Sequence, residues 1–181
     1  MVQKGNKILI HACCGICSGY PISLLKEEGY IPVVYFCNPN LDTKEEFIRR
    51  LEAQKTICDY HNVKLIVEEY NPDEFIESVK GLENEPERGR RCDKCIELRL
   101  KKTADKALEL GIGVFTTSLP ISPHKDFNKI STIGLKIADD LRLEYLPLDF
   151  KKKDGFLKTN MLSKKLNIYR QNYCGCRFSK H

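Results

Sequence analysis

The sequence predicts an α/β protein built on a doubly wound parallel sheet. Short apolar segments alternate along the chain with longer segments in which apolar residues recur at helical spacing. Such alternation is typical of strands joined by crossover helices, and that connection makes neighbouring strands parallel. The chain has 181 residues, which suits one domain. We therefore predict a single α/β domain over residues 1–181, with a cysteine-bearing tail at its C-terminal end.

Three strands and three helices are predicted in the first part of the chain. The strands are expected at 7–12, 31–36 and 63–68, and the helices at 20–28, from 43 onward and at 72–79. Pro21 is tolerated in a first helical turn, and Gly29 ends that helix. Thr43 followed by Glu46 forms a capping box for the second helix. The buried face of that helix is expected to hold Phe47, Ile48, Leu51 and Cys58, the last as a small core residue.

The second part of the chain continues the alternation. A long helix is expected at 92–110, a strand at 114–119, a helix at 126–139 and a strand at 143–148. The inner stripe of the long helix would be Ile96, Leu100, Ala104, Ala107 and Leu108. A basic loop is expected at 150–158, a last helix at 160–166 and an irregular tail beyond 168.

The composition is that of an ordinary globular protein. The formal net charge is +5, with 41% hydrophobic and 30% charged residues, which excludes a disordered chain. No N-terminal segment resembles a signal peptide, and no apolar run approaches the roughly 18 residues that a membrane-spanning helix needs. We therefore expect a cytoplasmic protein.

Nine cysteines are the most informative feature of the sequence. Thiols stay reduced in the cytoplasm, so a disulfide framework is not expected. Three motifs hold seven of them: Cys13, Cys14 and Cys17; Cys92 and Cys95; Cys174 and Cys176. Such close spacing favours metal or redox chemistry.

The predicted topology brings these cysteines together. In a doubly wound sheet the working residues gather at the carboxyl ends of the strands. Cys13, Cys14 and Cys17 follow the first predicted strand, Cys37 follows the second, and the segment 118–124 follows the fourth. We expect Cys17 and Cys37 to lie close to the site and His124 to reach substrate at its rim.

The number of thiols bears on the kind of metal. One zinc ion or one [4Fe–4S] cluster takes four protein ligands, so six or seven thiols exceed one closed site. The surplus indicates either two neighbouring metals or a cluster with an active thiol pair. Zinc has no redox chemistry, so iron is favoured.

Three segments resemble the motifs of the QueH-type epoxyqueuosine reductases. They are HACCGICS at 11–18, RCDKCIELR at 91–99 and IYRQNYCGC at 168–176, and TTSL at 116–119 and ISPHK at 121–125 match as well. The resemblance implies a sheet similar to that of the HUP and PP-loop nucleotide-binding proteins, an adenine nucleotide alpha hydrolase-like Rossmannoid layer. The loop after the first strand carries cysteines in place of the phosphate-binding SGGxDS pattern, so ATP use is not expected.

The resemblance also implies an activity and its cofactors. The enzyme would reduce epoxyqueuosine in tRNA to queuosine, using a [4Fe–4S] cluster, an additional mononuclear iron and an external electron donor. The metal ligands would be Cys13, Cys14, Cys92, Cys95, Cys174 and Cys176, and all of them except Cys13 are candidates for the cluster. Cys13, Cys14 and Cys176 are the candidate catalytic residues, and Ser118, Ser122, His124, Arg91 and Tyr173 the candidate substrate-binding residues.

A tRNA partner, bound through the anticodon loop that carries epoxyqueuosine, agrees with the distribution of charge. The candidate phosphate contacts are Arg88, Arg90, Arg91, Lys151, Lys152, Lys153, Arg177 and Lys180. Tyr169, Tyr173 and Phe178 could stack on an unstacked base. Two alternatives remain open at this point: a PP-loop tRNA thiolation enzyme and a non-enzymatic metal-binding module.

Overall fold

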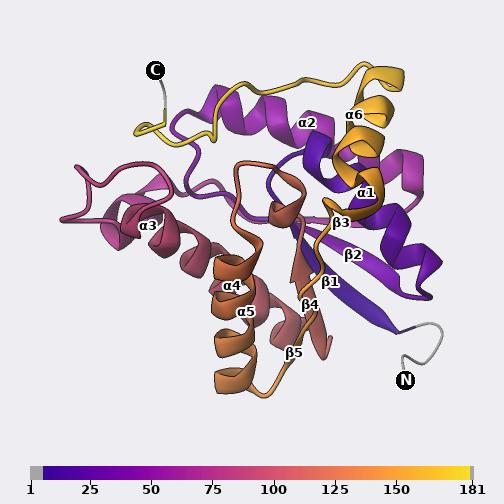
Figure 1. Ribbon diagram of the computed structural model, residues 1–181, viewed down its shortest axis with the longest axis horizontal. Coiled ribbons are helices and arrows are strands. Elements are labelled where there is room, and N and C mark those ends of the chain that lie inside the picture. The colour runs from indigo at the N-terminus through magenta and orange to yellow at the C-terminus, as the bar shows by residue number, and fades with distance from the viewer. Residues whose placement is uncertain (1–5, 180–181) are drawn as a thin grey trace.

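A five-stranded parallel sheet organises the structure, a computed structural model that describes residues 6–179. The strand order is β3-β2-β1-β4-β5 (Figure 1). The strands are β1 (Lys7–Ala12), β2 (Ile31–Phe36), β3 (Lys64–Val67), β4 (Val114–Thr117) and β5 (Glu144–Tyr145). From β1 the chain adds β2 and β3 on one side of the sheet, and it then adds β4 and β5 on the other side. The boundary between β1 and β4 is therefore the topological switch point, where such sheets bind ligands. The predicted doubly wound α/β fold is confirmed.

Six α-helices and two short 3-10 helices accompany the strands within the described residues, and the last two of these elements follow β5. They are α1 (Gly15–Glu27), α2 (Lys44–His61), α3 (Pro72–Ser78), α4 (Arg90–Leu110), η1 (Leu119–Ile121), α5 (Phe127–Leu141), η2 (Lys152–Asp154) and α6 (Gly155–Lys165). The tail then runs from α6 across α2 towards α3 (Figure 1). None of the helices in residues 6–179 is long and apolar enough to cross a membrane.

The two faces of the sheet have separate apolar cores. Leu9 on β1 and Phe115 on β4 pack with Leu100 of α4 and Ile130 of α5. On the other face, Ile8 and Ile10 of β1 pack with residues of α1 and α2, such as Leu25 and Ile57. Successive strand residues point to opposite faces, so a strand buried on both faces must be apolar throughout. Apart from His11, the buried residues of β1 and β2 are apolar.

Local signals place several helix ends. The Thr43 hydroxyl accepts the backbone N–H of Glu46, as the predicted cap requires. Asp126 caps α5 by accepting the N–H groups of Asn128 and Lys129. Gly111 ends α4 with φ +69, a left-handed conformation that glycine adopts without strain.

Two predictions about helix starts are wrong. The first helix begins at Gly15, five residues before the predicted start at 20, so Cys17 lies within α1 and Pro21 lies inside the helix. The last helix begins at Gly155, so part of the predicted basic loop at 150–158 is helical. Both helices start at a glycine that fits closely against its neighbours, and no sequence periodicity reports such a fit.

Two residues expected in the core are exposed. Ile48 on α2 and Leu108 on α4 are 47% and 48% exposed. On α2 the buried face is rotated, because it includes the polar residues Arg50 and Gln54. Cys58 is buried among the apolar side chains of this face, which confirms its predicted place in the core.

Gly155 provides a test of how α6 docks. A Cβ added there would overlap the backbone carbonyl of Phe150 and the ring of Tyr20. A backbone carbonyl cannot move away from an added Cβ as easily as the end of a flexible side chain can. We therefore predict that Gly155→Ala lowers the free energy of unfolding by about 1–3 kcal/mol. Urea denaturation measures this loss.

Gly113→Ala is the matched control, since a Cβ at Gly113 meets no atom within 4 Å. Its free energy of unfolding is expected to change by less than about 1 kcal/mol. Equal stability of the two variants would contradict the close packing at Gly155.

Candidate metal centre and substrate cavity

A cavity of about 850 Å³ opens at the carboxyl end of the sheet. It lies where the loop after β1, the segment after β4, the start of α4 and the tail meet. Five of the nine cysteines line it: Cys13, Cys17, Cys92, Cys174 and Cys176. The predicted convergence of the cysteine motifs is thus present in the fold.

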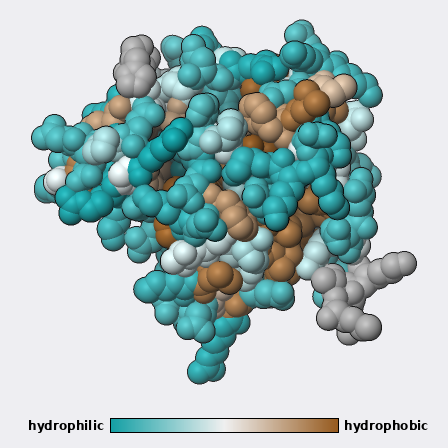
Figure 2. All heavy atoms as spheres, viewed as in Figure 1, coloured by the Kyte–Doolittle hydropathy of each residue, from teal (hydrophilic) through white to brown (hydrophobic). Residues whose placement is uncertain are grey.

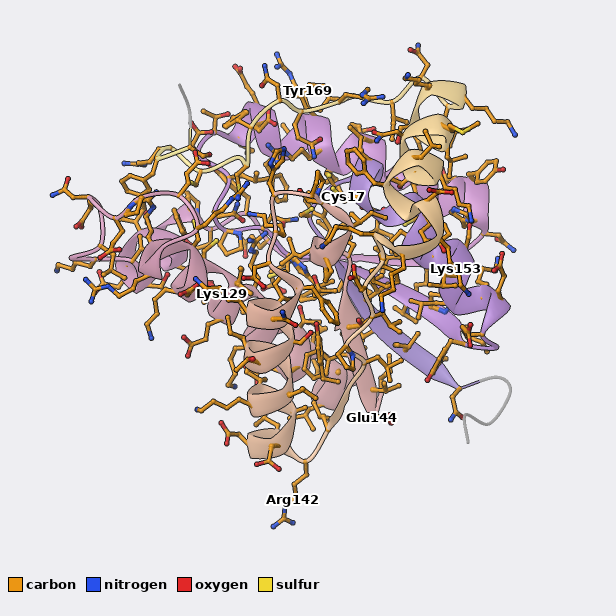
Figure 3. All side chains as sticks on the ribbon, viewed as in Figure 1. Cys17, Lys129, Arg142, Glu144, Lys153 and Tyr169 are labelled. Atoms are coloured by element: carbon orange, nitrogen blue, oxygen red, sulfur yellow. The ribbon has the colours of Figure 1, made fainter. Side chains whose placement is uncertain are left out.

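Cys13, Cys14 and Cys17 form one compact group of thiols. Their sulfur atoms all lie within 4.8 Å of one another, and the Sγ atoms of Cys13 and Cys14 are 3.8 Å apart. The group lies at the N-terminal end of α1, where free N–H groups and the helix dipole stabilise negative charge. In Figure 3, Cys17 lies at this end of α1, below the tail that carries Tyr169.

The three thiols of this group have different proton affinities. Hydrogen bonds from Cys14 and Cys17 lower the pKa of Cys13 well below its usual value. The same interaction with Cys13 raises the pKa of Cys14 to about 12 and raises that of Cys17. The group therefore stabilises a thiolate at Cys13, flanked by two thiols that donate to it.

Four other cysteines surround a second, smaller cavity of about 10 Å³. Cys92 and Cys95 come from the first turns of α4, where residues three apart share a face. Cys174 and Cys176 come from the tail, and their close neighbours include Lys125, whose Nζ lies 3.4 Å from the Cys174 Sγ. Three of the four, Cys92, Cys174 and Cys176, also face the large cavity.

Arg50 of α2 holds the tail in this position. Its guanidinium is buried and pairs with Glu46 at 2.7 Å. The same guanidinium donates to the backbone carbonyls of Tyr173 and Cys174 at 3.0 and 2.9 Å. The Asp42 N–H donates to the carbonyl of Gly175, whose φ of +115 allows the chain to turn between the two cysteines. The tail thiols are therefore fixed by contacts of the backbone.

Arg99 places a second buried cation beside the thiols. Its side chain is 2% exposed and borders both cavities, and its Nε donates to the carbonyl of Cys95 at 3.4 Å. Among residues 6–179, no carboxylate forms an ion pair with it. Burial opposes its charge, but the sulfurs of Cys95, Cys174, Cys13 and Cys37 together raise its pKa. Negative charge on the cysteines is what compensates this cation.

Two more polar residues contact the thiols directly. The Gln171 Nε2 donates to the Cys14 Sγ at 2.6 Å. Burial alone would lower the pKa of Lys125, but Cys174 and Cys95 together raise it and keep the ammonium charged. Gln171 thereby joins the tail to the group at α1, and Lys125 joins the loop after η1 to the tail.

The candidate substrate-binding residues differ in their accessibility. Ser122, His124, Arg91 and Tyr173 line the large cavity. The Ser122 Oγ accepts the His124 N–H at 3.2 Å, and the His124 Nδ1 lies 3.2 Å from the Arg88 guanidinium. Ser118 is fully buried and is not among the described residues that line this cavity.

Arg91 and Tyr173 are held by other parts of the chain. The Arg91 guanidinium donates to the carbonyls of Leu82, Glu83 and Glu85 and lies over the ring of Phe178. The Tyr173 hydroxyl donates to Asp42 at 3.1 Å, and its ring lies under Arg50. Each therefore presents only part of its surface to the cavity.

Of the aromatic residues expected to stack on a base, Tyr169 donates to Glu46 and Phe178 packs against Phe75. Lys180, a candidate phosphate contact, lies outside the described residues.

Cys37 is fully buried in the core beneath the site. His11 is buried too, with its two ring nitrogens bonded to Thr117 and the carbonyl of Cys37. Burial lowers the pKa of His11 to about 4, so the ring is neutral near pH 7.

Sequence reasoning missed Arg50, Gln171 and Phe156, and it missed that Arg99, within the motif at 91–99, is buried. Arg50 and Arg99 occur in charged helices, where an arginine is ordinarily solvated. Gln171 lies within the motif at 168–176, which predicts no role for it. Phe156 lines the large cavity but lies in the predicted loop at 150–158. A buried position for Arg99 could have been inferred from its spacing, since it follows Cys95 by four residues on the same helical face.

The donor set fits iron and sulfur chemistry. A metal ion with four ligands at 2.3 Å holds its sulfurs about 3.8 Å apart, and Cys13 and Cys14 have this separation. A cluster of four irons holds its thiolates farther apart, because each thiolate binds a different iron. Four thiols border the small cavity, and four is the number of thiolates that such a cluster binds. Soft thiolate ligands of this kind select iron–sulfur clusters and zinc over hard cations.

Comparison with known proteins identifies relatives along nearly the whole chain. The family model described as "Epoxyqueuosine reductase QueH" matches residues 8–181. A curated protein of that name from Streptococcus pyogenes is 39% identical over 178 residues, which span 95% of this chain and 69% of that protein. Another of that name, from Thermotoga maritima, is 32% identical, with 95% of this chain and 89% of that protein covered.

Two solved structures share the fold at low sequence identity. The U34-tRNA thiolase NcsA from Methanococcus maripaludis, with its [4Fe-4S] cluster, has a TM-score of 0.61 at 13% identity and covers 99% of this chain and 63% of its own. A predicted subunit of tRNA methyltransferase from Methanocaldococcus jannaschii has a TM-score of 0.59 at 12% identity, with 84% and 73% covered. The expected PP-loop-like, adenine nucleotide alpha hydrolase-like sheet is thereby confirmed.

The role of Arg50 can be tested in the protein without metal. We predict that Arg50→Met releases the tail, because two backbone carbonyls lose their donors and Glu46 loses its partner. Hydrogen exchange of the amides at 172–176 is expected to become at least tenfold faster, whereas the amides of β1 remain protected. Arg49→Met is the control, since this neighbour lies over the ring of Tyr169 and is not a donor to the carbonyls of Tyr173 and Cys174. Unchanged exchange in Arg50→Met would contradict the anchoring role.

Proposed function

The chain belongs to the epoxyqueuosine reductase QueH family, and on that premise we propose how its residues bind the cofactor and the substrate. The enzyme is an oxidoreductase of tRNA modification that reduces epoxyqueuosine to queuosine. We propose that it acts on the nucleotide within the anticodon loop of tRNA, in the cytoplasm, with electrons from an external donor. The observation that carries the proposal is the convergence of the three cysteine motifs at the carboxyl end of the sheet, where five of their seven thiols line one cavity.

The two groups of thiols would hold different metal centres. Cys92, Cys95, Cys174 and Cys176 would bind the [4Fe–4S] cluster, since they surround one space and come from two segments. Cys13, Cys14 and Cys17 would bind the additional iron, since their sulfur atoms lie within 4.8 Å of one another and this spacing suits a single ion. This assignment moves Cys14, a candidate cluster ligand, to the second centre, and it adds Cys17 to the metal-binding residues.

The reaction requires two electrons and two protons. Both C–O bonds of the epoxide break, the oxygen leaves as water, and a carbon–carbon double bond remains. When bound, the iron centres supply the electrons one at a time and polarise the C–O bond as a Lewis acid. The protons must come from side chains or water in the cavity.

Two side chains of the cavity are placed to hold such protons. The Lys125 ammonium stays charged beside Cys174. Burial, followed by the hydrogen bond to Asp42, raises the pKa of Tyr173 to about 12, so that the phenol stays protonated near neutral pH. Cys13, Cys14 and Cys176 remain our candidates for direct participation, with Cys13 as the thiolate of its group.

Binding of the nucleotide would use the rim of the cavity. Ser122 and His124 are accessible there and can contact its hydroxyl groups. Arg91 and Tyr173 would shape the cavity wall, and Ser118 would act from beneath. Cysteines occupy the loop after β1, at the position where PP-loop enzymes carry their phosphate-binding glycines, so no ATP step enters the proposal.

The assay that tests this function uses tRNA bearing epoxyqueuosine. Anaerobically purified, iron-loaded protein under reducing conditions is expected to remove one oxygen atom from the modified nucleoside, as measured by mass spectrometry. Protein loaded with zinc is the control and is expected to leave the nucleoside unchanged, because zinc carries no electrons. Absence of conversion by fully reduced, iron-loaded protein would overturn the proposed function.

A matched pair of cysteine variants tests the metal ligands. Cys92→Ala is expected to lose the visible absorbance of the cluster and to lower the conversion of tRNA more than about 100-fold, since losing even an outer partner of a metal ligand costs 10- to 100-fold. Cys58→Ala is expected to keep both, because Cys58 is buried in the core and bonded to Gln54. Full absorbance in Cys92→Ala, or its loss in a folded Cys58→Ala, would contradict this assignment.

A further inference from the structure

The net positive charge of the protein comes from its C-terminal part. Residues 151–181 carry nine Lys or Arg and one Asp, whereas residues 1–150 carry 21 Lys or Arg and 24 Asp or Glu. The first 150 residues are therefore slightly acidic, and the net charge of +5 comes from the last 31. The basic residues from 151 up to residue 179, where the described residues end, belong to η2 with its N-cap Lys151, to α6 and to the tail.

Helix α6 also exposes apolar side chains. Phe156 is 42% exposed, Leu157 57% and Met161 61%. The opposite face of the helix packs on α1, where the Thr159 hydroxyl donates to the carbonyl of Ile16. Figure 2 shows hydrophobic atoms gathered over α6 and bordered by hydrophilic ones. An apolar strip flanked by lysines is unusual for a solvated helix face, since such a face is ordinarily polar throughout.

This exposed strip is continuous with the substrate cavity. Phe156 and Asn160 lie on the side of α6 that lines the cavity, together with Arg170 of the tail. Arg170 donates to the Asn160 side chain at 3.0 Å. Leu157, Met161 and Lys164 follow around the helix at positions that point outward. Lys152 and Lys153 lie in the turn before α6, and Figure 3 labels Lys153 beside that end of the helix.

We propose that η2 and α6 form the surface that docks the RNA strand next to the modified nucleotide, with Phe156 stacking on a neighbouring base at the cavity mouth. This rests on the proposed function, because it takes tRNA as the substrate. The occupant is a looped, single-stranded RNA segment: its phosphates match the lysines, and its unstacked bases match the exposed ring and the apolar strip.

The aromatic residues of the tail fit this role less well. Tyr169 and Tyr173 are bonded through their hydroxyls to Glu46 and Asp42, and Phe178 packs between Phe75 and Arg91. Among the aromatic side chains that line the cavity, Phe156 is the one with its ring at the surface.

The test measures the binding of a fluorescent anticodon stem–loop RNA at several salt concentrations. For single-stranded RNA, the logarithm of the binding constant falls linearly with the logarithm of the salt concentration. The magnitude of this slope decreases by about 0.7 for each phosphate contact that is removed. The triple variant Lys152→Ala, Lys153→Ala and Lys164→Ala is therefore expected to lower the slope by about 2. Its matched control removes three exposed lysines on other helices, Lys55, Lys101 and Lys136, and is expected to keep the wild-type slope.

Phe156 is tested in the same titration. Phe156→Leu keeps an apolar side chain but removes the ring, and binding is expected to weaken by about fivefold to 150-fold. Phe156→Trp is expected to bind at least as tightly as wild type. Equal affinity of the Leu and Trp variants with wild type would overturn the stacking role.

Two further outcomes would overturn the docking surface. One is an equal loss of slope in the triple variant and in its control. The other is self-association through the strip, seen as a dimer in sedimentation that Leu157→Lys abolishes while RNA binding stays unchanged. Because binding is measured without turnover, these results are separate from the reductase assay, and an inactive enzyme that bound RNA through α6 would refute the function alone.

Discussion

The site depends on one buried interaction, the contact of Arg50 with the backbone of the tail. The irregular tail supplies two of the four thiols around the small cavity. Such a segment becomes ordered only if its contacts outweigh the conformational entropy that it loses. Arg50 provides them at the carbonyls beside Cys174, and Glu46 compensates its charge. A buried ion pair adds little net stability, but removing one partner costs several kcal/mol. Its value here lies in fixing one arrangement of the tail.

A second constraint is the balance of charge around the four thiols. The small cavity is bordered by four cysteines and by three cationic side chains, Arg91, Arg99 and Lys125, and no carboxylate of the described residues joins them. Buried cations of this kind are costly unless negative charge lies nearby. Thiolates, and the anionic cluster that we propose they hold, would supply that charge. The same cations make it easier to add an electron to a cluster, since net charge and hydrogen bonds set its potential.

Much of the fold, and part of the site, could be predicted from the sequence. Apolar periodicity places β1 and β2, and the topology then predicts that cysteines at distant positions meet at one edge of the sheet. Which thiols lie together at that edge could not be predicted, because it depends on the directions of the side chains. Cys17 joins Cys13 and Cys14 only because α1 begins at Gly15, where an added Cβ would meet the carbonyl of Ala53. The burial of Arg50 and Arg99 escaped prediction, because burial of a cation is decided by partners from other segments.

The origin of the thiols in three distant segments has a consequence for the synthesis of the protein. Cys13 to Cys17 and Cys92 to Cys95 leave the ribosome well before Cys174 and Cys176, which follow about 80 residues later. At 5–20 residues per second, that delay is roughly 4 to 16 seconds. Within this interval, once β4 has emerged, the nascent chain can pair β1, β2 and β4, yet it offers only half of the four-thiol group. The complete set of proposed ligands arises only after the sheet strands have been synthesised, so binding of the cluster would require that the tail has docked.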